Sequence, residues 1–102
     1  MHVKIRNKTA VIEFEDNRDS SGHSNVMKEI IGLIDNGFKK FVFDFKYVEI
    51  SFNSGVSGFM ITIVKKITES GADVVITNIS ESDKNLLKLV GLFSFSDKVS
   101  CE

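Results

Sequence analysis

Small and hydroxylated residues gather in one short segment of the chain, and their types suit phosphate chemistry. The segment consists of Ser51, Phe52, Asn53, Ser54, Gly55, Val56, Ser57 and Gly58. It directly precedes the clearest helical pattern of the chain, so we expect it to form the start of a helix. The first amides of a helix lack intrahelical partners and lie at the positive end of the helix dipole. A phosphate attached to this segment, or an anionic ligand docked on it, is therefore stabilised there.

Helix capping is the alternative explanation of the same segment. Asn53 or Ser51 can accept hydrogen bonds from the first helical amides. The small residues also let the helix pack closely on a sheet or allow another surface to approach. On composition alone, capping is the simpler explanation. The segment is not a Walker loop, because the Gly-Lys-Ser or Gly-Lys-Thr element is absent.

The polar stretch at residues 15–24 holds other reactive side chains. Asp19, Ser20, Ser21 and His23 include the residue types of a catalytic triad. Such close neighbours on one loop rarely reach the required geometry of nucleophile, base and orienting acid. A solvated loop that leads into a helix explains them better. We therefore predict no catalytic residue, and a protein that is not an enzyme.

Metal coordination is not indicated either. Glu13, Glu15, Asp16 and Asp19 offer oxygen ligands for a hard cation, yet their spacing matches no EF-hand loop. The two scattered histidines and the single C-terminal cysteine show no recurrent ligand spacing. We expect neither a bound metal nor a cofactor.

The elements that position these residues begin with a β-hairpin. Apolar residues alternate at 3–5 and resume at 10–14, and Asn7-Lys8 between them suits a turn. The polar stretch at 15–24 then follows as an exposed loop.

From Asn25 the apolar period becomes helical. The residues at this spacing are Val26, Met27, Ile30, Ile31 and Ile34. Ser21 or Ser24 can cap this helix, and Asn36-Gly37 supplies a left-handed stop. The apolar run Phe41–Phe45 follows, which predicts a central strand covered on both faces.

The second half of the chain predicts a helix, a strand and a further helix. Apolar residues recur by three and four from Val56 to Ile67, and Ser70-Gly71 ends this pattern. The stretch 73–77 indicates a buried strand. Ser80 with Asp83 resembles a capping box that opens a third helix, which Gly91 ends.

Composition indicates one compact domain over residues 1–102. The chain has 102 residues, a 42% hydrophobic fraction and no proline, which allows one core. Strands that alternate with helices after a hairpin predict an α/β fold with a mixed sheet, because parallel strands need helical crossovers.

Charge and hydropathy exclude several kinds of partner. The formal net charge is -1, so the chain lacks the positive surface that nucleic acid demands. No segment approaches the ~20 apolar residues that span a bilayer, and residues 1–6 lack the apolar stretch of a secretory signal. Cys101 cannot form an internal disulfide, because it is the single cysteine. We expect a cytoplasmic protein without nucleic-acid binding or membrane insertion.

The order of these elements and the segment at 51–58 together resemble the STAS domain family, in particular its anti-sigma factor antagonists. In that family an apolar strand ending near Asp is followed by Asp-Ser-Ser-Gly-Leu-Gly, which opens a helix. Here Phe41-Val-Phe-Asp44 precedes Phe52-Asn-Ser-Gly-Val-Ser57. Downstream, Gly71 before Val74-Val-Ile-Thr77 and the sequence Leu89-Val-Gly-Leu-Phe93 also match the family pattern. The resemblance implies a mixed sheet with an N-terminal hairpin and three or more helices packed mainly on one face.

The resemblance also assigns roles within the segment. In phosphorylation-switched members the first serine of the motif is phosphorylated by a kinase that is also the anti-sigma factor. That position is Asn53 here, which cannot take a phosphoryl group. Ser54 matches the second serine and is the candidate phosphoacceptor of a phosphoprotein. Asn53 imitates an unphosphorylated serine, so a constitutively binding member is the alternative. The family's C-terminal helix is expected to be short, since residues 94–102 follow the third helix.

We therefore predict a protein-binding regulatory domain of signal transduction and transcription regulation. The partner-binding residues are predicted to be Ser51, Asn53, Ser54, Gly55, Ser57, Asp19, Ser20 and Ser21. The expected partner is an anti-sigma factor or a serine kinase of that type, or other STAS proteins. Two alternatives stay open: a structural subunit of a stressosome-like or lipid-transport complex, and a small nucleotide-binding module that holds a phosphate at the helix start.

Overall fold

Eight helices and strands make up the part of the chain that the structure describes. The computed structural model describes residues 2–14, 21–46, 54–89, 91–92 and 98–101. The elements are β1 (His2–Arg6), β2 (Thr9–Glu13), α1 (Ser21–Asp35), β3 (Lys40–Asp44), α2 (Ser54–Glu69), β4 (Asp73–Thr77), α3 (Glu81–Leu89) and β5 (Val99–Cys101). The predicted order of hairpin, helix, strand, helix, strand and helix is confirmed.

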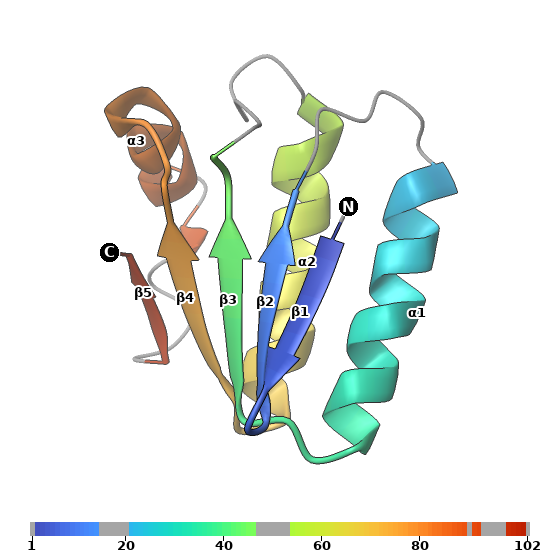
Figure 1. Cartoon of the computed structure of the whole chain (residues 1–102). Coiled ribbons are helices and arrows are strands. Elements are labelled where there is room, and N and C mark those ends of the chain that lie inside the picture. The colour runs from blue at the N-terminus through green and yellow to red at the C-terminus, as the bar shows by residue number, and fades with distance from the viewer. Residues whose placement is uncertain (1, 15–20, 47–53, 90, 93–97, 102) are drawn as a thin grey trace.

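The strands form one mixed sheet in the order β1-β2-β3-β4-β5 (Figure 1). β1 pairs with β2 in antiparallel fashion, and every later neighbour pair is parallel. The two hairpin strands meet at Asn7 and Lys8, whose φ angles of 49° and 66° are both positive. Two consecutive residues with positive φ form a tight hairpin turn, and the twist of this turn matches the twist of the two strands that it joins. The predicted α/β fold with an N-terminal hairpin is thus confirmed.

Helices α1 and α2 lie on one face of this sheet, and α3 lies beyond the carboxyl end of β4 (Figure 1). Alternate strand residues point toward the helices and form the core. These buried residues include Ala10, Ile12 and Phe14 of the β2 segment, Phe41, Phe43 and Phe45 of the β3 segment, and Val74 and Ile76 of β4. They pack against Val26 and Ile30 of α1 and against Met60, Ile63, Val64 and Ile67 of α2.

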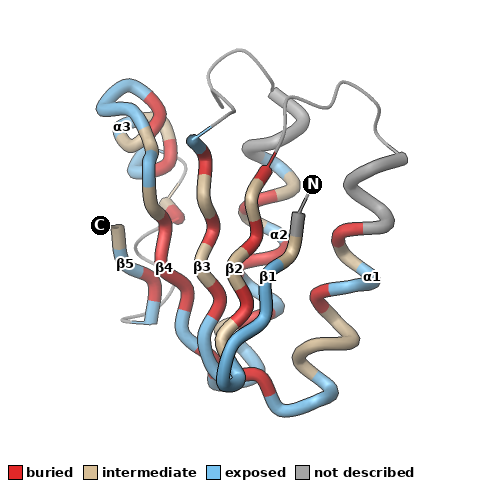
Figure 2. Tube along the Cα trace, in the orientation of Figure 1, coloured by how far each residue is buried: buried red, intermediate tan, exposed pale blue. Residues whose placement is uncertain are grey.

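The prediction that the 41–45 strand is covered on both faces is wrong. Its residues alternate in burial, because Phe41 and Phe43 have no exposed surface whereas Val42 and Asp44 are half-buried (Figure 2). The apolar run led to this wrong prediction because Val42, although apolar, lies on the sheet face that α1 and α2 leave uncovered. One valine between phenylalanines looks like a fully buried strand in the sequence, since period-2 alternation needs a polar residue to be visible.

Glycines end two of the helices as predicted. At the end of α1, the amide of Phe38 donates to the Leu33 carbonyl and that of Gly37 donates to the Ile34 carbonyl, with Gly37 at a φ of 83°. This pair of bonds is the Schellman motif, which needs a left-handed residue at the Gly37 position. Gly71 ends α2 in the same way, with a φ of 91°.

Two features of the fold differ from the expectation. α1 begins at Ser21, so residues 21–24 are helical rather than part of a loop. A fifth strand, β5, pairs with β4 through Val99 opposite Val74, in the stretch expected to hold a short helix. Three residues are too few for a periodic signal, which explains why the strand was not predicted.

Candidate functional site

The described ends of the two predicted binding segments lie at the carboxyl edge of the sheet, at one end of the molecule. β2, β3 and β4 are parallel and in register, with Glu13 opposite Asp44 and Asp44 opposite Thr77. The chain leaves β2 at this edge toward α1 and leaves β3 at the same edge toward α2. The first turns of both helices therefore lie at the end of the fold where the parallel strands finish (Figure 1).

The structure describes part of the predicted site. Ser54 is the first residue of α2, and Gly55 and Ser57 belong to its first turn. Ser21 is the first residue of α1, in a helix rather than in the expected loop. The remaining predicted binding residues, Asp19, Ser20, Ser51 and Asn53, lie outside the described residues.

An aromatic cluster fixes the start of α2 at this edge. We define the cluster as Phe14, Phe43, Phe45 and Phe59. The rings of Phe14 and Phe45 stack with centroids 4.9 Å apart and planes within 2°. Phe14 also meets Phe43 edge-on at 5.4 Å and Phe59 at 6.4 Å. Because Phe59 lies in the second turn of α2, these contacts join the amino end of that helix to the ends of β2 and β3.

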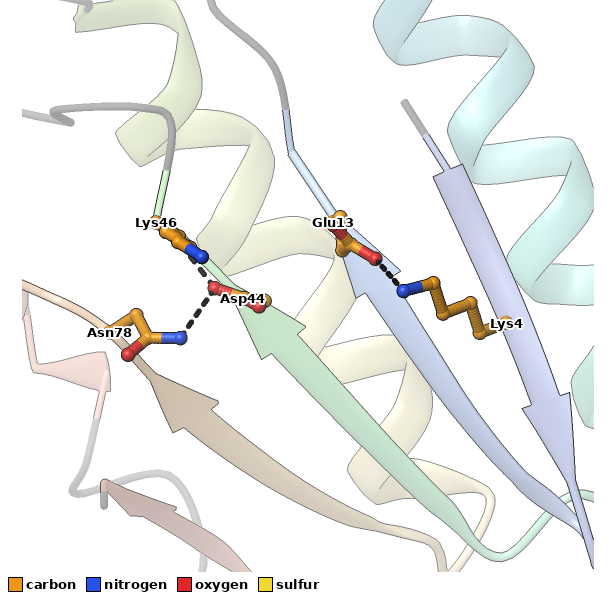
Figure 3. A network of polar contacts seen from close by, with 5 residues as sticks. All are labelled: Lys4, Glu13, Asp44, Lys46 and Asn78. Carbon is orange, nitrogen blue, oxygen red and sulfur yellow. Dashed lines mark hydrogen bonds and ion pairs between the residues drawn. The ribbon is translucent and has the colours of Figure 1, made fainter.

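A polar network ties the ends of β3 and β4 together (Figure 3). One carboxylate oxygen of Asp44 accepts hydrogen bonds from the Lys46 amide and from the Asn78 side-chain amide, both at 2.9 Å. The Phe45 amide donates to the Thr77 carbonyl at 3.1 Å, which continues the ladder past the strand end. Asp44 therefore holds the first residues of the segment that leads from β3 to α2.

Sequence reasoning missed Asn78 as a member of this edge. Its φ is 58°, in the left-handed region that asparagine tolerates better than most residues. This conformation turns the chain from β4 toward α3, where the Ser80 hydroxyl accepts a hydrogen bond from the Asp83 amide at 3.1 Å. The predicted serine cap of the third helix is confirmed. The sequence signal that could have identified Asn78 is its position as an asparagine directly after a predicted strand.

The electrostatics of the α2 start suit an anion. α2 has 16 residues, and its first turn contains no acidic side chain. The unpaired amides and the positive end of the dipole are therefore not offset by a carboxylate within that turn. Glu13, one of the four acidic residues considered above as ligands of a cation, forms an ion pair with Lys4 at 2.8 Å (Figure 3).

Other site types find no support in the described part of the chain. No group of three or more histidine, cysteine or acidic residues there can hold a metal ion. Open hollows of about 450 and 390 Å³ lie along α2, lined by Ile61, Thr62, Lys65, Lys66, Thr68 and Glu69. These residues lie beyond the first turn of α2, so the hollows are separate from its amino end. None of the described helices is long and apolar enough to cross a bilayer.

A mixed sheet with α1 and α2 on one face, whose first turns lie at the carboxyl edge, defines a class of small α/β domains. Within that class the family model of the STAS domain matches residues 1–100. The chain belongs to the STAS domain family, as the sequence resemblance predicted. No curated protein sequence matches the chain.

Solved structures show the same fold. The protein TM1081, solved by NMR, superposes with a TM-score of 0.74 at 17% identity, over 95% of this chain and 77% of that one. The anti-sigma factor antagonist SpoIIAA in its unphosphorylated form superposes with a TM-score of 0.70 at 15% identity, over 99% of this chain and 86% of that one. The predicted similarity to anti-sigma factor antagonists is confirmed at the level of the fold.

Proposed function

We propose that this chain is a non-enzymatic regulatory domain of the anti-sigma factor antagonist type, acting in the cytoplasm. It binds an anti-sigma factor kinase through residues 51–57, with residues 19–24 as a second contact. The observation that carries the proposal is the position of Ser54, the first residue of a 16-residue helix at the carboxyl edge of the sheet.

Contacts at the two ends of the segment that joins β3 to α2 support this contact surface. The stacked rings of Phe14 and Phe45, 4.9 Å apart, and the Asp44 carboxylate hold the β3 flank of the segment that joins β3 to α2, and the contact of Phe14 with Phe59 holds the α2 flank. A preorganised base lowers the entropy lost when a partner docks. α1 and α2 start at the same edge, so one partner surface can contact both helix starts.

Phosphorylation at Ser54 is the proposed way of releasing the partner. A phosphate adds about −1.5 to −2 charges. At the first residue of α2 this charge lies beside amides that stabilise it, while it changes the surface offered to the partner. Asn53 in place of the family's acceptor serine favours a second candidate function, in which the domain binds its partner permanently as a scaffold or structural subunit.

Intact mass and complex formation test the proposal together. The pure domain is incubated with ATP and with anti-sigma factor kinases from its source, as wild type, Ser54→Ala and Asn53→Ser. We expect the wild-type domain to bind a kinase, to gain the mass of one phosphate and then to release the kinase. Ser54→Ala should bind without gaining mass. Asn53→Ser, which restores the family's acceptor type, should gain phosphate faster than wild type.

Ser82→Ala is the matched control, because Ser82 is an exposed serine in the first turn of another helix. It should behave as wild type. Binding without any mass change in wild type would favour the permanent scaffold. Failure to bind any of the kinases would rule out the kinase partner.

A further inference from the structure

The sheet face opposite α1 and α2 carries an ordered pattern of residues. We call it the open face and define it by the residues of β2, β3 and β4 that alternate with the core. These are Thr9, Val11 and Glu13, then Lys40, Val42 and Asp44, then Asp73, Val75 and Thr77. In register they form three rows, and the middle row consists of the three valines.

The valine row is apolar, and two of its three members are incompletely covered. Val11 and Val42 are half-buried, and Val75 retains 7% exposure, whereas Ile12, Phe43 and Ile76 on the helix side have none. Neither α1 nor α2 lies over this face (Figure 1). A continuous apolar row across three strands is the kind of surface on which a second sheet can pack.

The charges on β3 are antisymmetric about the valine row. Lys40 lies two residues before Val42 and Asp44 two residues after it, so the opposite charges stand about 13 Å apart along the strand. Lys40 is exposed and has no ion pair among the described residues. Asp44 is half-buried and accepts hydrogen bonds from the Lys46 amide and the Asn78 side chain.

We infer that the open face binds a second copy of this chain, sheet against sheet, about a two-fold axis that runs along the valine row. Such an axis reverses the strand direction between copies. It places Val42 over Val42 of the other copy. It also places Lys40 over Asp44 of the other copy, and this charge contact occurs twice in the dimer. Aligned sheets pack in this way about 10 Å apart, and a two-fold interface needs this self-complementary pattern.

The flanking charges are compatible with this pairing. Lys4 extends the valine row on β1, so the two-fold axis places it over Lys4 of the other copy, and its ion pair with Glu13 at 2.8 Å offsets these like charges. Asp73 forms one with Lys98 at 3.8 Å. These charges are balanced within one copy, so the contact between Lys40 and Asp44 decides the relative direction of the two sheets.

The area of the open face predicts weak association. Three strands of five residues cover about 14 by 17 Å per copy. This is below the size of stable interfaces, so we expect an association that is seen only at high protein concentration. The pairing leaves the carboxyl edge accessible, because the open face and the first turn of α2 lie on different sides of the sheet.

Charge exchange between two variants tests the inference. Lys40→Glu and Asp44→Lys each place like charges opposite one another in a homodimer. Mixed, they restore two attractive contacts in the heterodimer. Sedimentation of the full chain from 10 µM to 1 mM should show wild type dimerising, each variant weakened by roughly tenfold or more, and the mixture associating again.

Lys65→Glu is the control with the same charge change, because Lys65 is exposed on α2 and away from the open face. It should dimerise as wild type. Circular dichroism checks the fold of each variant. If Asp44→Lys does not fold, Val42→Asp replaces it and must abolish the dimer. A monomeric wild type at 1 mM, a Lys40→Glu variant that dimerises normally, or a mixture without heterodimer would overturn the inference.

Discussion

At the scale of single residues, the contacts at the carboxyl edge depend on Asn78 and Asp44. Asn78 supplies two things at once: a left-handed backbone with a φ of 58° and a side chain that donates to Asp44 at 2.9 Å. The two contributions can be separated, since glycine keeps the first and loses the second, whereas alanine loses both.

Asn78→Gly should lower the free energy of unfolding by about 1 kcal/mol, the value of an exposed hydrogen bond. Asn78→Ala should lower it by about 1–2 kcal/mol more, because a Cβ atom disfavours the left-handed region. Urea unfolding of both variants measures the difference. Equal stability of the two would mean that the backbone conformation contributes nothing here.

A second pair of residues compares two glycines of the α1 segment. Gly32 lies inside the helix with no atom within 4 Å of an added Cβ, whereas Gly37 ends it at a φ of 83°. Gly32→Ala should stabilise the protein by about 0.5–1 kcal/mol, because glycine loses more backbone entropy in a helix. Gly37→Ala should destabilise it by about 1 kcal/mol. Thermal unfolding of the two variants should give shifts of opposite sign.

At the scale of elements, the aromatic cluster connects the core to the candidate site. Phe14 is 7% exposed and stacks on Phe45, and it also reaches Phe59 of α2. The cluster therefore couples the packing of two strand ends to the position of the α2 start.

Phe14→Ala should destabilise the protein by about 3–5 kcal/mol and should increase hydrogen exchange in the first two turns of α2. Phe38→Ala is the matched control. Phe38 is 8% exposed and lies just before β3, at the opposite edge of the sheet. It should cost a similar free energy without selective exchange at the α2 start. Equal exchange there in both variants would contradict the proposed coupling.

Most elements could be predicted from the sequence because their signals are local. Apolar spacing and the stops at Gly37, Gly71 and Gly91 fix the helices, and these glycines have φ angles of 83°, 91° and 80°. The amino end of α1 was predicted four residues too late. Ser21, Gly22, His23 and Ser24 have weak helix propensity, but the helix continues through them from the anchored stripe at Val26 and Ile30.

At the scale of the whole molecule, the sequence predicted the α/β class and the mixed sheet but not how the sheet faces are used. Helical crossovers follow from alternating elements, so the parallel order was accessible. The half-exposed position of Val42 was not, because it depends on where α1 and α2 lie in space. The same holds for Asn78, whose contact with Asp44 joins residues 34 positions apart.

The candidate site was predictable in part for the same reason. The segment at 51–58 stood out by composition, and the structure starts α2 at Ser54 within it. The supporting contacts of Phe14 and Asp44 come from other strands and need the sheet register to be known. Local patterns thus indicated the candidate segment, whereas the residues that hold its described end in place required the structure.

An NMR titration tests the central claim, that a protein partner binds at the carboxyl edge. The isotopically labelled domain is titrated with anti-sigma factor kinases from its source. We predict that amide shifts concentrate in the first turn of α2, in the start of α1, and at Lys46 and Asn78. The turn at Asn7 and Lys8, at the opposite edge, should remain unchanged. Shifts centred on that turn, or no shifts with any kinase, would contradict the account.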